Sequence, residues 1–286
     1  MPFVAVAAGI ASFSLMDGLM KGASLAIGAY SAMLWRSLAG IVIMAPVWKL
    51  GGGRWPDRAV MKLHAVRGLN SAAMATTFFW GLKYLPLAEG MAISFIAPLI
   101  ALYLAAVTLG ETIGRKAVIA SILGLAGVLV IVAGRFGESG YDRDAAWGIA
   151  AILTSAVLYA WNLILQRRQA QIADPREIAM FQAVFCGLFL AVLAPWLLQV
   201  PTPAVWIDLI GSAVLAAISL MLIAWGYARE ETQVLLPLEY SAFIWAALLG
   251  WVMFAEALTW PTVAGAVLIV AGCLMATRKH IEQTAL

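Results

Sequence analysis

The chain has 286 residues, of which 64% are hydrophobic and 12% are charged, and its mean hydropathy is +0.94. A soluble domain carries about 25% charged residues, so the composition excludes an ordinary soluble globular protein and predicts an integral membrane protein. The net charge of +3 is too small and too scattered for a nucleic-acid-binding surface, so no nucleic-acid partner is expected.

Ten apolar windows follow one another along the chain, separated by short segments that contain Pro and Gly. About 20 helical residues cross the roughly 30 Å of bilayer hydrocarbon, so each window predicts one transmembrane helix. No Lys or Arg precedes the first window and Asp17 interrupts it, which favours a permanent span over a cleaved signal peptide. The windows cover residues 3–21, 28–48, 67–84, 87–109, 116–134, 146–166, 177–199, 205–227, 232–254 and 258–277.

The basic residues predict the orientation of these helices. If the N-terminus lies in the cytoplasm, most of the 18 Lys and Arg residues fall in cytoplasmic loops. The positive-inside rule therefore predicts a multi-pass protein of a bacterial-type inner membrane with both termini in the cytoplasm. The residues left on the outer side are Lys21, Lys83, Arg135 and Arg143.

The two halves of the chain repeat each other at an offset of 145 residues. The shift carries Trp80-Gly81 onto Trp225-Gly226 and Glu111 onto Glu256. Because each half holds an odd number of spans, the halves must cross the membrane in opposite orientations. Two inverted repeats with a substrate site between them near the bilayer midplane are the architecture of many secondary transporters.

Each half ends its fourth span with a short motif, Leu109-Gly110-Glu111 or Phe254-Ala255-Glu256, before a glycine-containing fifth span. With these tandem five-span units, the chain resembles the EamA-type branch of the drug/metabolite transporter (DMT) superfamily. The resemblance implies an all-α integral membrane protein of ten transmembrane helices in two inverted five-helix repeats. Its pattern is similar to the YddG-type exporters of aromatic and other amino acids, although Phe243 stands where the offset from Pro98 would place a proline. The implied divisions are a first repeat over 1–134, a second over 146–277 and a cytoplasmic tail over 278–286.

Polar side chains inside the apolar windows are the candidate substrate-binding residues. A charge at the bilayer centre costs about 2.5–3.5 kcal/mol, so Asp17, Arg36 and Glu239 should face the interior of the bundle. Ser14, Asp17 and Lys21 share one helical face, which favours a cavity, although an Asp17–Lys21 pair would also offset the burial. The 145-residue shift carries this stripe onto Tyr159, Asn162 and Gln166.

Several of these residues have more than one interpretation. Arg36 suits bidentate binding of a substrate carboxylate or a structural pair with Asp17. Glu239 suits a substrate ammonium, a coupling proton, a gate or a structural pair. Pro98 removes a backbone hydrogen bond and predicts a kink in the fourth span. The remaining candidates are Trp80 and Trp161 as walls of the site, together with Asn70, Thr77, Tyr84, Ser94 and Gln182.

Other motifs narrow the chemistry. Glycines in the fifth and tenth spans indicate a scaffold or a dimer contact, so a monomer or a homodimer is expected. The sequence has no phosphate-binding loop and no zinc-type cluster, because His64 and His280 are far apart and are expected outside the spans. Cys186 and Cys273 lie in apolar runs and are interpreted as small buried side chains. No cofactor, no metal and no enzymatic activity are expected.

Together these features predict a secondary transporter of small organic metabolites that works by alternating access. The most specific expectation is an inner-membrane amino-acid exporter, whose partners are its small-molecule substrate and the lipid bilayer. The resemblance alone implies the export direction. The alternatives are a DMT carrier of drugs, amines or sugar-type metabolites, an integral-membrane enzyme acting on lipid-linked substrates, and an ion channel.

Overall fold

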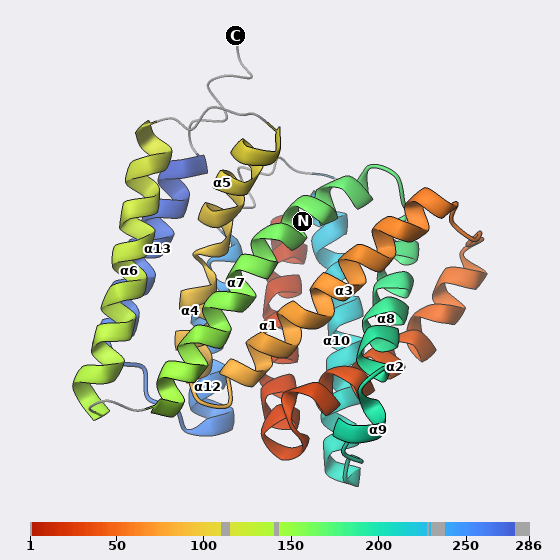
Figure 1. The fold of residues 1–286 in the computed structure, drawn as a ribbon, viewed down its shortest axis with the longest axis horizontal. Helices are drawn as coiled ribbons and strands as arrows, with labels where there is room; N and C mark the ends of the chain where they lie inside the picture. The colour runs from red at the N-terminus through yellow and green to blue at the C-terminus, as the bar shows by residue number, and fades with distance from the viewer. Residues whose placement is uncertain (1, 110–114, 140–142, 228, 230–237, 278–286) are drawn as a thin grey trace.

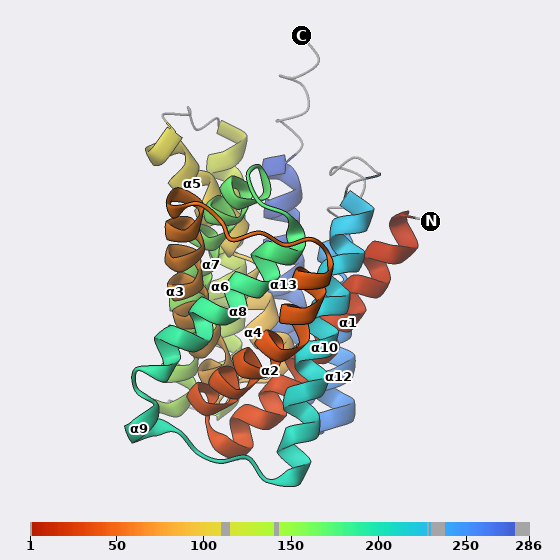
Figure 2. The same cartoon turned by 90° about the vertical axis from the view of Figure 1, so that its right-hand side faces the viewer.

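The computed structural model describes residues 2–109, 115–139, 143–227, 229 and 238–277. Within these ranges all regular structure is helical, which confirms the predicted all-α class, and the helices run side by side as one bundle (Figure 1). Figure 2 shows that α1 begins and α13 ends toward the same end of the bundle. The helices are α1 (Pro2–Ile27), α2 (Ala29–Leu50), α3 (Arg58–Gly81), α4 (Leu87–Ser94), α5 (Ala97–Leu109), α6 (Arg115–Ser139), α7 (Arg143–Ala170), α8 (Pro175–Ala191), α9 (Ala194–Leu197), α10 (Pro203–Tyr227), α12 (Ala242–Phe254) and α13 (Trp260–Thr277).

Every predicted window contains helix, but some windows are not one continuous span. The fourth window is broken between Ser94 and Ala97, and the seventh ends its long helix at Ala191. The expected kink at Pro98 is corrected to a break at residues 95–96. Pro98 lies in the first turn of α5, where a backbone N–H would have no acceptor within the helix, so the proline costs no hydrogen bond. Four of the described helices, in α1, α2, α7 and α10, are long and apolar enough to cross a membrane without interruption.

The 145-residue repeat reappears in the helix boundaries. Helices α3 and α10 begin at residues 58 and 203, α5 and α12 at 97 and 242, and α6 and α13 at 115 and 260. The break in the fourth window, at residues 95–96, also has its counterpart at residues 240–241. The two halves therefore share their helix starts as well as their sequence motifs.

The equivalent helices run in opposite directions. In the α2–α8 pair, Gly40 faces Ala183, whereas Gly187, further along α8, faces Ser37, earlier in α2. Helices α6 and α13 pair in the same antiparallel way, with Gly127 facing Gly265. The two repeats are thus inverted, as an odd number of spans per half requires. The glycine faces of α6 and α13 pack against each other as a scaffold.

The repeated Trp-Gly motif lies at close contacts between helices of the two halves. A Cβ atom on Gly81 would come within 2.9 Å of the Gly148 carbonyl oxygen on α7, and one on Gly226 within 2.3 Å of a Val6 methyl group on α1. Any side chain at either position would force the backbones apart. The sequence repeat at Gly81 and Gly226 therefore preserves two equivalent contacts, α3 with α7 and α10 with α1.

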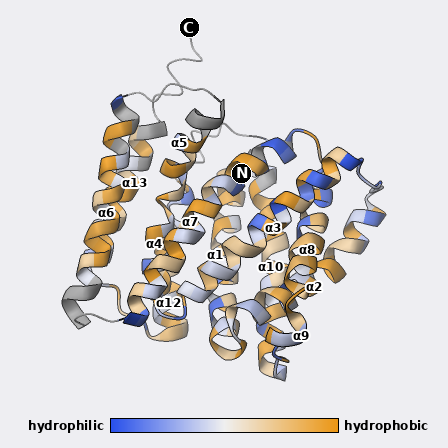
Figure 3. Cartoon of the chain, in the orientation of Figure 1, coloured by the Kyte–Doolittle hydropathy of each residue, from blue (hydrophilic) through white to orange (hydrophobic). Residues whose placement is uncertain are grey.

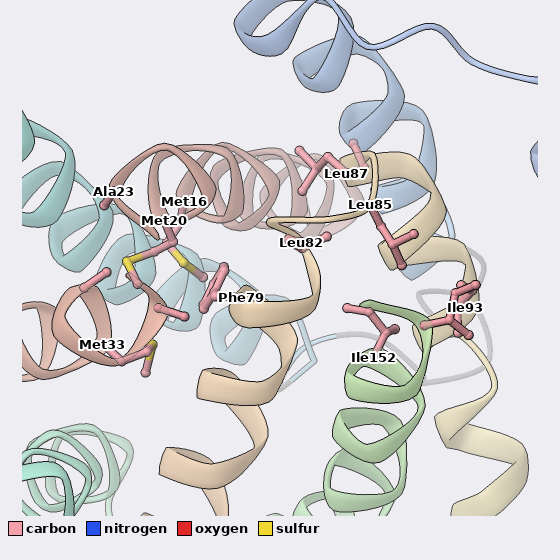
Figure 4. Packing of buried hydrophobic residues seen from close by; sticks show 14 of the residues in the cluster. Met16, Met20, Ala23, Met33, Phe79, Leu82, Leu85, Leu87, Ile93 and Ile152 are labelled. Atoms are coloured by element: carbon pink, nitrogen blue, oxygen red, sulfur yellow. The ribbon is translucent and has the colours of Figure 1, made fainter. Parts of the chain in front are cut away.

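Side chains from both halves build one hydrophobic core. Figure 4 shows Met20 and Met33 near Phe79, with Leu82, Ile93 and Ile152 further along the same cluster. The outer surface is also apolar, since Val42 is 74% exposed and Trp251 is 66% exposed, and hydrophobic residues occur along all the long helices (Figure 3). A large apolar exterior of this kind fits hydrocarbon and not water.

Candidate substrate-binding site

The polar stripe of α1 is buried, but its members have different partners. Ser14, Asp17 and Lys21 are each at most 3% exposed. Lys21 donates to the Leu85 carbonyl oxygen and pairs with Glu256, so the Asp17–Lys21 pair considered from the sequence does not form. Among the described residues, Asp17 has no hydrogen bond and no ion pair within 4 Å. Its carboxylate is therefore buried without a direct partner.

Arg36 of α2 lies near Asp17 and is also poorly paired. Asp17 and Arg36 interact electrostatically, but they form no ion pair within 4 Å in the described part of the chain. The hydrogen bond found for the guanidinium runs from Nη1 to the Met16 Sδ atom at 3.0 Å. A thioether sulfur is a weak acceptor, so most of the five N–H donors of Arg36 remain available.

Ser14 completes a group of three under-paired polar side chains. Its Oγ atom is buried and makes no hydrogen bond to any described residue. Most buried polar atoms in proteins are hydrogen-bonded, so a buried hydroxyl and carboxylate without partners, beside a half-buried guanidinium with only a weak acceptor, call for an explanation. We refer to Ser14, Asp17 and Arg36 as the unpaired cluster.

Tyr159 of α7 brings the second half to this cluster. It interacts electrostatically with Asp17, Arg67 and Glu239, which come from three other elements of the bundle. The side chain is nevertheless 37% exposed. Tyr159 of the second half therefore interacts with charged residues of both halves.

The other polar residues predicted on α7 belong to a second group, around Arg67 of α3. Asn162 Oδ1 accepts hydrogen bonds from Arg67 Nε and Ser71 Oγ, both at 3.2 Å, and Gln166 Oε1 accepts from Arg67 Nη2 at 3.4 Å. Gln182 of α8 donates to Ser71 Oγ at 3.3 Å. These side chains satisfy one another, so they connect α3 to α7 and α8 structurally.

Sequence reasoning missed the rest of this network. Arg67 also donates to Gln169 at 2.5 Å, Gln169 bonds to His64 at 2.6 Å, and His64 bonds to Glu177 at 3.0 Å. His64, which was predicted to lie outside the spans, is fully buried in helix α3, where its ring stacks on Phe181. The signal was present in the spacing of residues 64, 67 and 71, which fall on one helical face. The predicted window began at residue 67 and so concealed this face.

The remaining candidates are satisfied locally or lie elsewhere. Asn70 donates to the Leu158 carbonyl at 3.0 Å and joins α3 to α7, while Thr77 and Ser94 bond to carbonyls of their own helices. Trp80 packs edge-to-face on Tyr84, with ring centroids 5.1 Å apart. Trp161 follows Tyr159 by two residues, about 200° around α7, so the structure does not bring it to the unpaired cluster.

The two helix breaks meet each other. Phe95 and Tyr240, which are related by the 145-residue shift, pack edge-to-face with ring centroids 5.5 Å apart. Two equivalent residues in contact must lie near the pseudo-twofold axis that relates the repeats. Glu239 is exposed and directly precedes one of these breaks. Discontinuous helices at a repeat interface mark the substrate region of many transporters.

Lys21 and Glu256 link the two halves at one end of the bundle, beside a hollow of about 330 Å³ that both residues line. Lys21 Nζ donates to the Leu85 carbonyl oxygen at 2.7 Å and to Glu256, and Glu256 Oε2 accepts from the Leu87 N–H at 2.7 Å. Ala255 adopts a left-handed conformation (φ 54°) that turns the chain before Glu256. This link joins α1 and the α3–α4 connection of the first half to the α12–α13 connection of the second. The repeat mate of Glu256, Glu111, lies outside the described residues.

The fold and this interior therefore define a multi-pass membrane carrier built from inverted repeats. Comparison with known proteins gives the family: the EamA-like transporter family matches residues 2–133 and 146–278, so the chain belongs to it. This is a non-enzymatic family of secondary transporters of small metabolites, within the DMT superfamily.

Its relatives are distant and carry different names. The chain is 26% identical over 279 residues to the pseudopaline exporter CntI of Pseudomonas aeruginosa, covering 93% of this chain and 92% of that protein. It is 24% identical over 257 residues to a riboflavin transporter of Vibrio cholerae, covering 86% and 82%. It is 29% identical over 209 residues to the aromatic amino acid exporter YddG of Ancylobacter novellus, covering 70% of each chain. A solved structure with 21% identity aligns at a TM-score of 0.66 over 98% of both chains and shows the same fold.

Proposed function

We propose that this carrier exports amino acids and similar zwitterionic metabolites, and that the unpaired cluster binds them. The observation that carries the proposal is the pair of opposite charges on neighbouring helices, a buried Asp17 and a half-buried Arg36, which interact without a direct ion pair in the described part of the chain. An α-amino acid brings an ammonium group for Asp17 and a carboxylate for Arg36. Ser14 Oγ supplies a further hydrogen bond.

The charge pattern separates this substrate class from the alternatives. A buried charge without a partner is strongly unfavourable, so a ligand that pairs both groups gains more than one that pairs a single group. An amine would pair Asp17 and leave the Arg36 guanidinium unmatched. A sugar would leave both charges unmatched. Hydrogen bonds to charged groups contribute about 1.5–3 kcal/mol each, which favours the zwitterion about tenfold or more over either rival.

Aromatic residues between the repeats suit a variable side chain. Tyr159 interacts electrostatically with Asp17, and the Phe95–Tyr240 pair lies near the axis between the repeats. Apolar and aromatic walls with a few polar groups are typical of small-molecule sites. The name of one relative, an aromatic amino acid exporter, supports this class, and two relatives named as exporters support the direction.

The transport cycle follows from the closure at one end. The Lys21–Glu256 contact joins the two halves and has to break if the site is to open at that end. If both termini lie in the cytoplasm, below a bacterial-type inner membrane, this end of the carrier faces outward. In alternating access, the site opens at this end when a contact at the cytoplasmic end closes. The division into repeats 1–134 and 146–277, with a tail over 278–286, is part of this proposal.

Counterflow in liposomes tests the proposal. Purified carrier is reconstituted and loaded in turn with a mixture of amino acids, with polyamines and with sugars. We expect saturable exchange of amino acids alone. Asp17→Asn should reduce it at least tenfold, whereas Asp208→Asn, which changes an aspartate of α10 in contact with Gly22 and not with the cluster, should leave it intact. Exchange of polyamines or sugars without amino acids would refute the substrate class.

A further inference from the structure

A hollow of about 470 Å³ lies on the side of the bundle between α3 and α8, away from the unpaired cluster. It opens where α3 begins, next to the connection from α2. The residues that line it combine two cations with an apolar wall. They are Pro56, Arg58, Met61, Lys62, Ala65 and Phe185.

The two cations of the hollow are available for a ligand. Arg58 and Lys62 are exposed and lie one helical turn apart, so their side chains share a face of α3. Neither makes a hydrogen bond or an ion pair with any residue that the structure describes. The nearby Asp57 carboxylate already accepts from the Val60 N–H at 2.9 Å, as the N-cap of α3.

The surroundings of the hollow have the profile of a membrane interface. Leu50 is 88% exposed and Trp55 is 75% exposed, and both flank the basic residues Lys49 and Arg54. Further along α3, on the same side as Arg58 and Lys62, Leu69 is 51% exposed. Figure 3 shows hydrophilic residues at the start of α3, which continues with mixed hydrophilic and hydrophobic residues. Cations therefore occupy the end of a face that continues into hydrocarbon.

We propose that this hollow binds an anionic phospholipid of the cytoplasmic leaflet. Arg58 and Lys62 bind the headgroup phosphate, and an acyl chain lies along Met61, Ala65 and Phe185. The lipid, unlike a soluble anion, matches both the charge and the apolar wall. Basic pockets at the cytoplasmic side of membrane helices bind such headgroups, and each cation contributes about 1 kcal/mol. The assignment to this leaflet rests on the orientation given under the proposed function, but the binding chemistry does not depend on which substrate is carried.

Lipid retention by the purified, intact carrier tests the site. The protein is incubated with phosphatidylglycerol, with phosphatidylcholine or with soluble glycerol phosphate, and bound lipid is counted by native mass spectrometry. We expect selective retention of phosphatidylglycerol. The double variant Arg58→Gln/Lys62→Gln should weaken it by about 10- to 30-fold, because two cations of about 1 kcal/mol each are lost. Arg115→Gln, an exposed cation at the start of α6, is the matched control and should change nothing.

Two further measurements keep the proposal falsifiable. Ala65→Trp fills the hollow without changing its charge and should also reduce lipid retention, whatever the folding yield of the double variant. Equal retention of both lipids, or undiminished retention in the folded variants, would overturn the proposal. Equal binding of glycerol phosphate would show an anion site in place of a lipid site. Amino-acid counterflow is a separate readout, so its failure would leave this result unaffected.

Discussion

Removing the Lys21–Glu256 contact should open the closed end of the carrier. In Glu256→Gln, the buried Lys21 ammonium keeps its bond to the Leu85 carbonyl but loses its paired carboxylate, and only the electrostatic interaction with Glu89 remains. Breaking one side of a buried ion pair costs 3–5 kcal/mol. The Glu256 side chain is 18% exposed, which puts the cost near the lower limit, at about 3 kcal/mol. That energy shifts the balance between closed and open forms by about 100-fold.

Thiol accessibility measures this shift. A single cysteine replaces Ser24, which is buried in α1 close to Lys21, in a protein whose native cysteines are changed to serine. A membrane-impermeant thiol reagent should modify it slowly in the parent and about 100-fold faster in Glu256→Gln. Lys83→Met is the matched control, because Lys83 lies at the same end but has no partner among the described residues.

Charge exchange at the same two positions sharpens this test. In Lys21→Glu/Glu256→Lys the ion pair returns, but the backbone partners, the Leu85 carbonyl and the Leu87 N–H, now face the wrong charges. Closure should therefore recover only in part. Unchanged accessibility in Glu256→Gln, or the same increase in Lys83→Met, would refute the assignment of this contact as a closure.

Three further predictions concern stability and selectivity. Gly81→Ala should lower the free energy of unfolding by about 1–3 kcal/mol, because the new Cβ atom would overlap Gly148 and Ile152. The control Gly22→Ala should be tolerated, since the nearest atom to its new Cβ would lie at 3.6 Å. Equal thermal stabilities of the two variants would contradict the close approach at Gly81. Ala255→Gly should stabilise the protein by about 0.5–1 kcal/mol, since Ala255 has a left-handed backbone conformation and the equivalent residue of the first repeat is Gly110. A lowered melting temperature would count against this account. Arg67→Met should lower the free energy of unfolding by about 3 kcal/mol, because the buried hydrogen-bond network loses its guanidinium donor. The ratio of amino-acid to polyamine exchange should stay constant. A changed ratio would assign Arg67 to the substrate site.

The helices and the repeat were largely predictable from the sequence, since both are properties of local composition. Ten apolar windows mark ten stretches of helix, and the Trp-Gly pairs at residues 80 and 225 lie at equivalent contacts. The sequence indicated the break at residues 95–96 only as a kink at Pro98, and the break at residues 240–241 has no proline at the equivalent position, Phe243. Packing at the repeat axis determines where these helices stop.

The partners of the polar residues were harder to predict. Lys21 pairs with Glu256 across 235 positions of sequence, and hydropathy holds no information about such pairs. Arg67 was placed in a cytoplasmic loop because it lies at a window edge, yet it is 5% exposed in α3. Of the three charges expected in the interior, Asp17 is buried, Arg36 is half-buried and Glu239 is exposed. Only the structure shows that Asp17 and Arg36 form no direct ion pair with a described residue, while Asn162 and Gln182 are hydrogen-bonded.

The most direct test of the zwitterion site is a matrix of two variants against three ligands. Binding of phenylalanine, phenethylamine and 3-phenylpropionate is measured by thermal shift for the parent, Asp17→Asn and Arg36→Gln. We expect the parent to prefer phenylalanine, Arg36→Gln to bind phenylalanine and phenethylamine equally, and Asp17→Asn to bind phenylalanine and 3-phenylpropionate equally. A parent-like preference for phenylalanine in both variants would contradict the account, because neither charge would then contact the substrate.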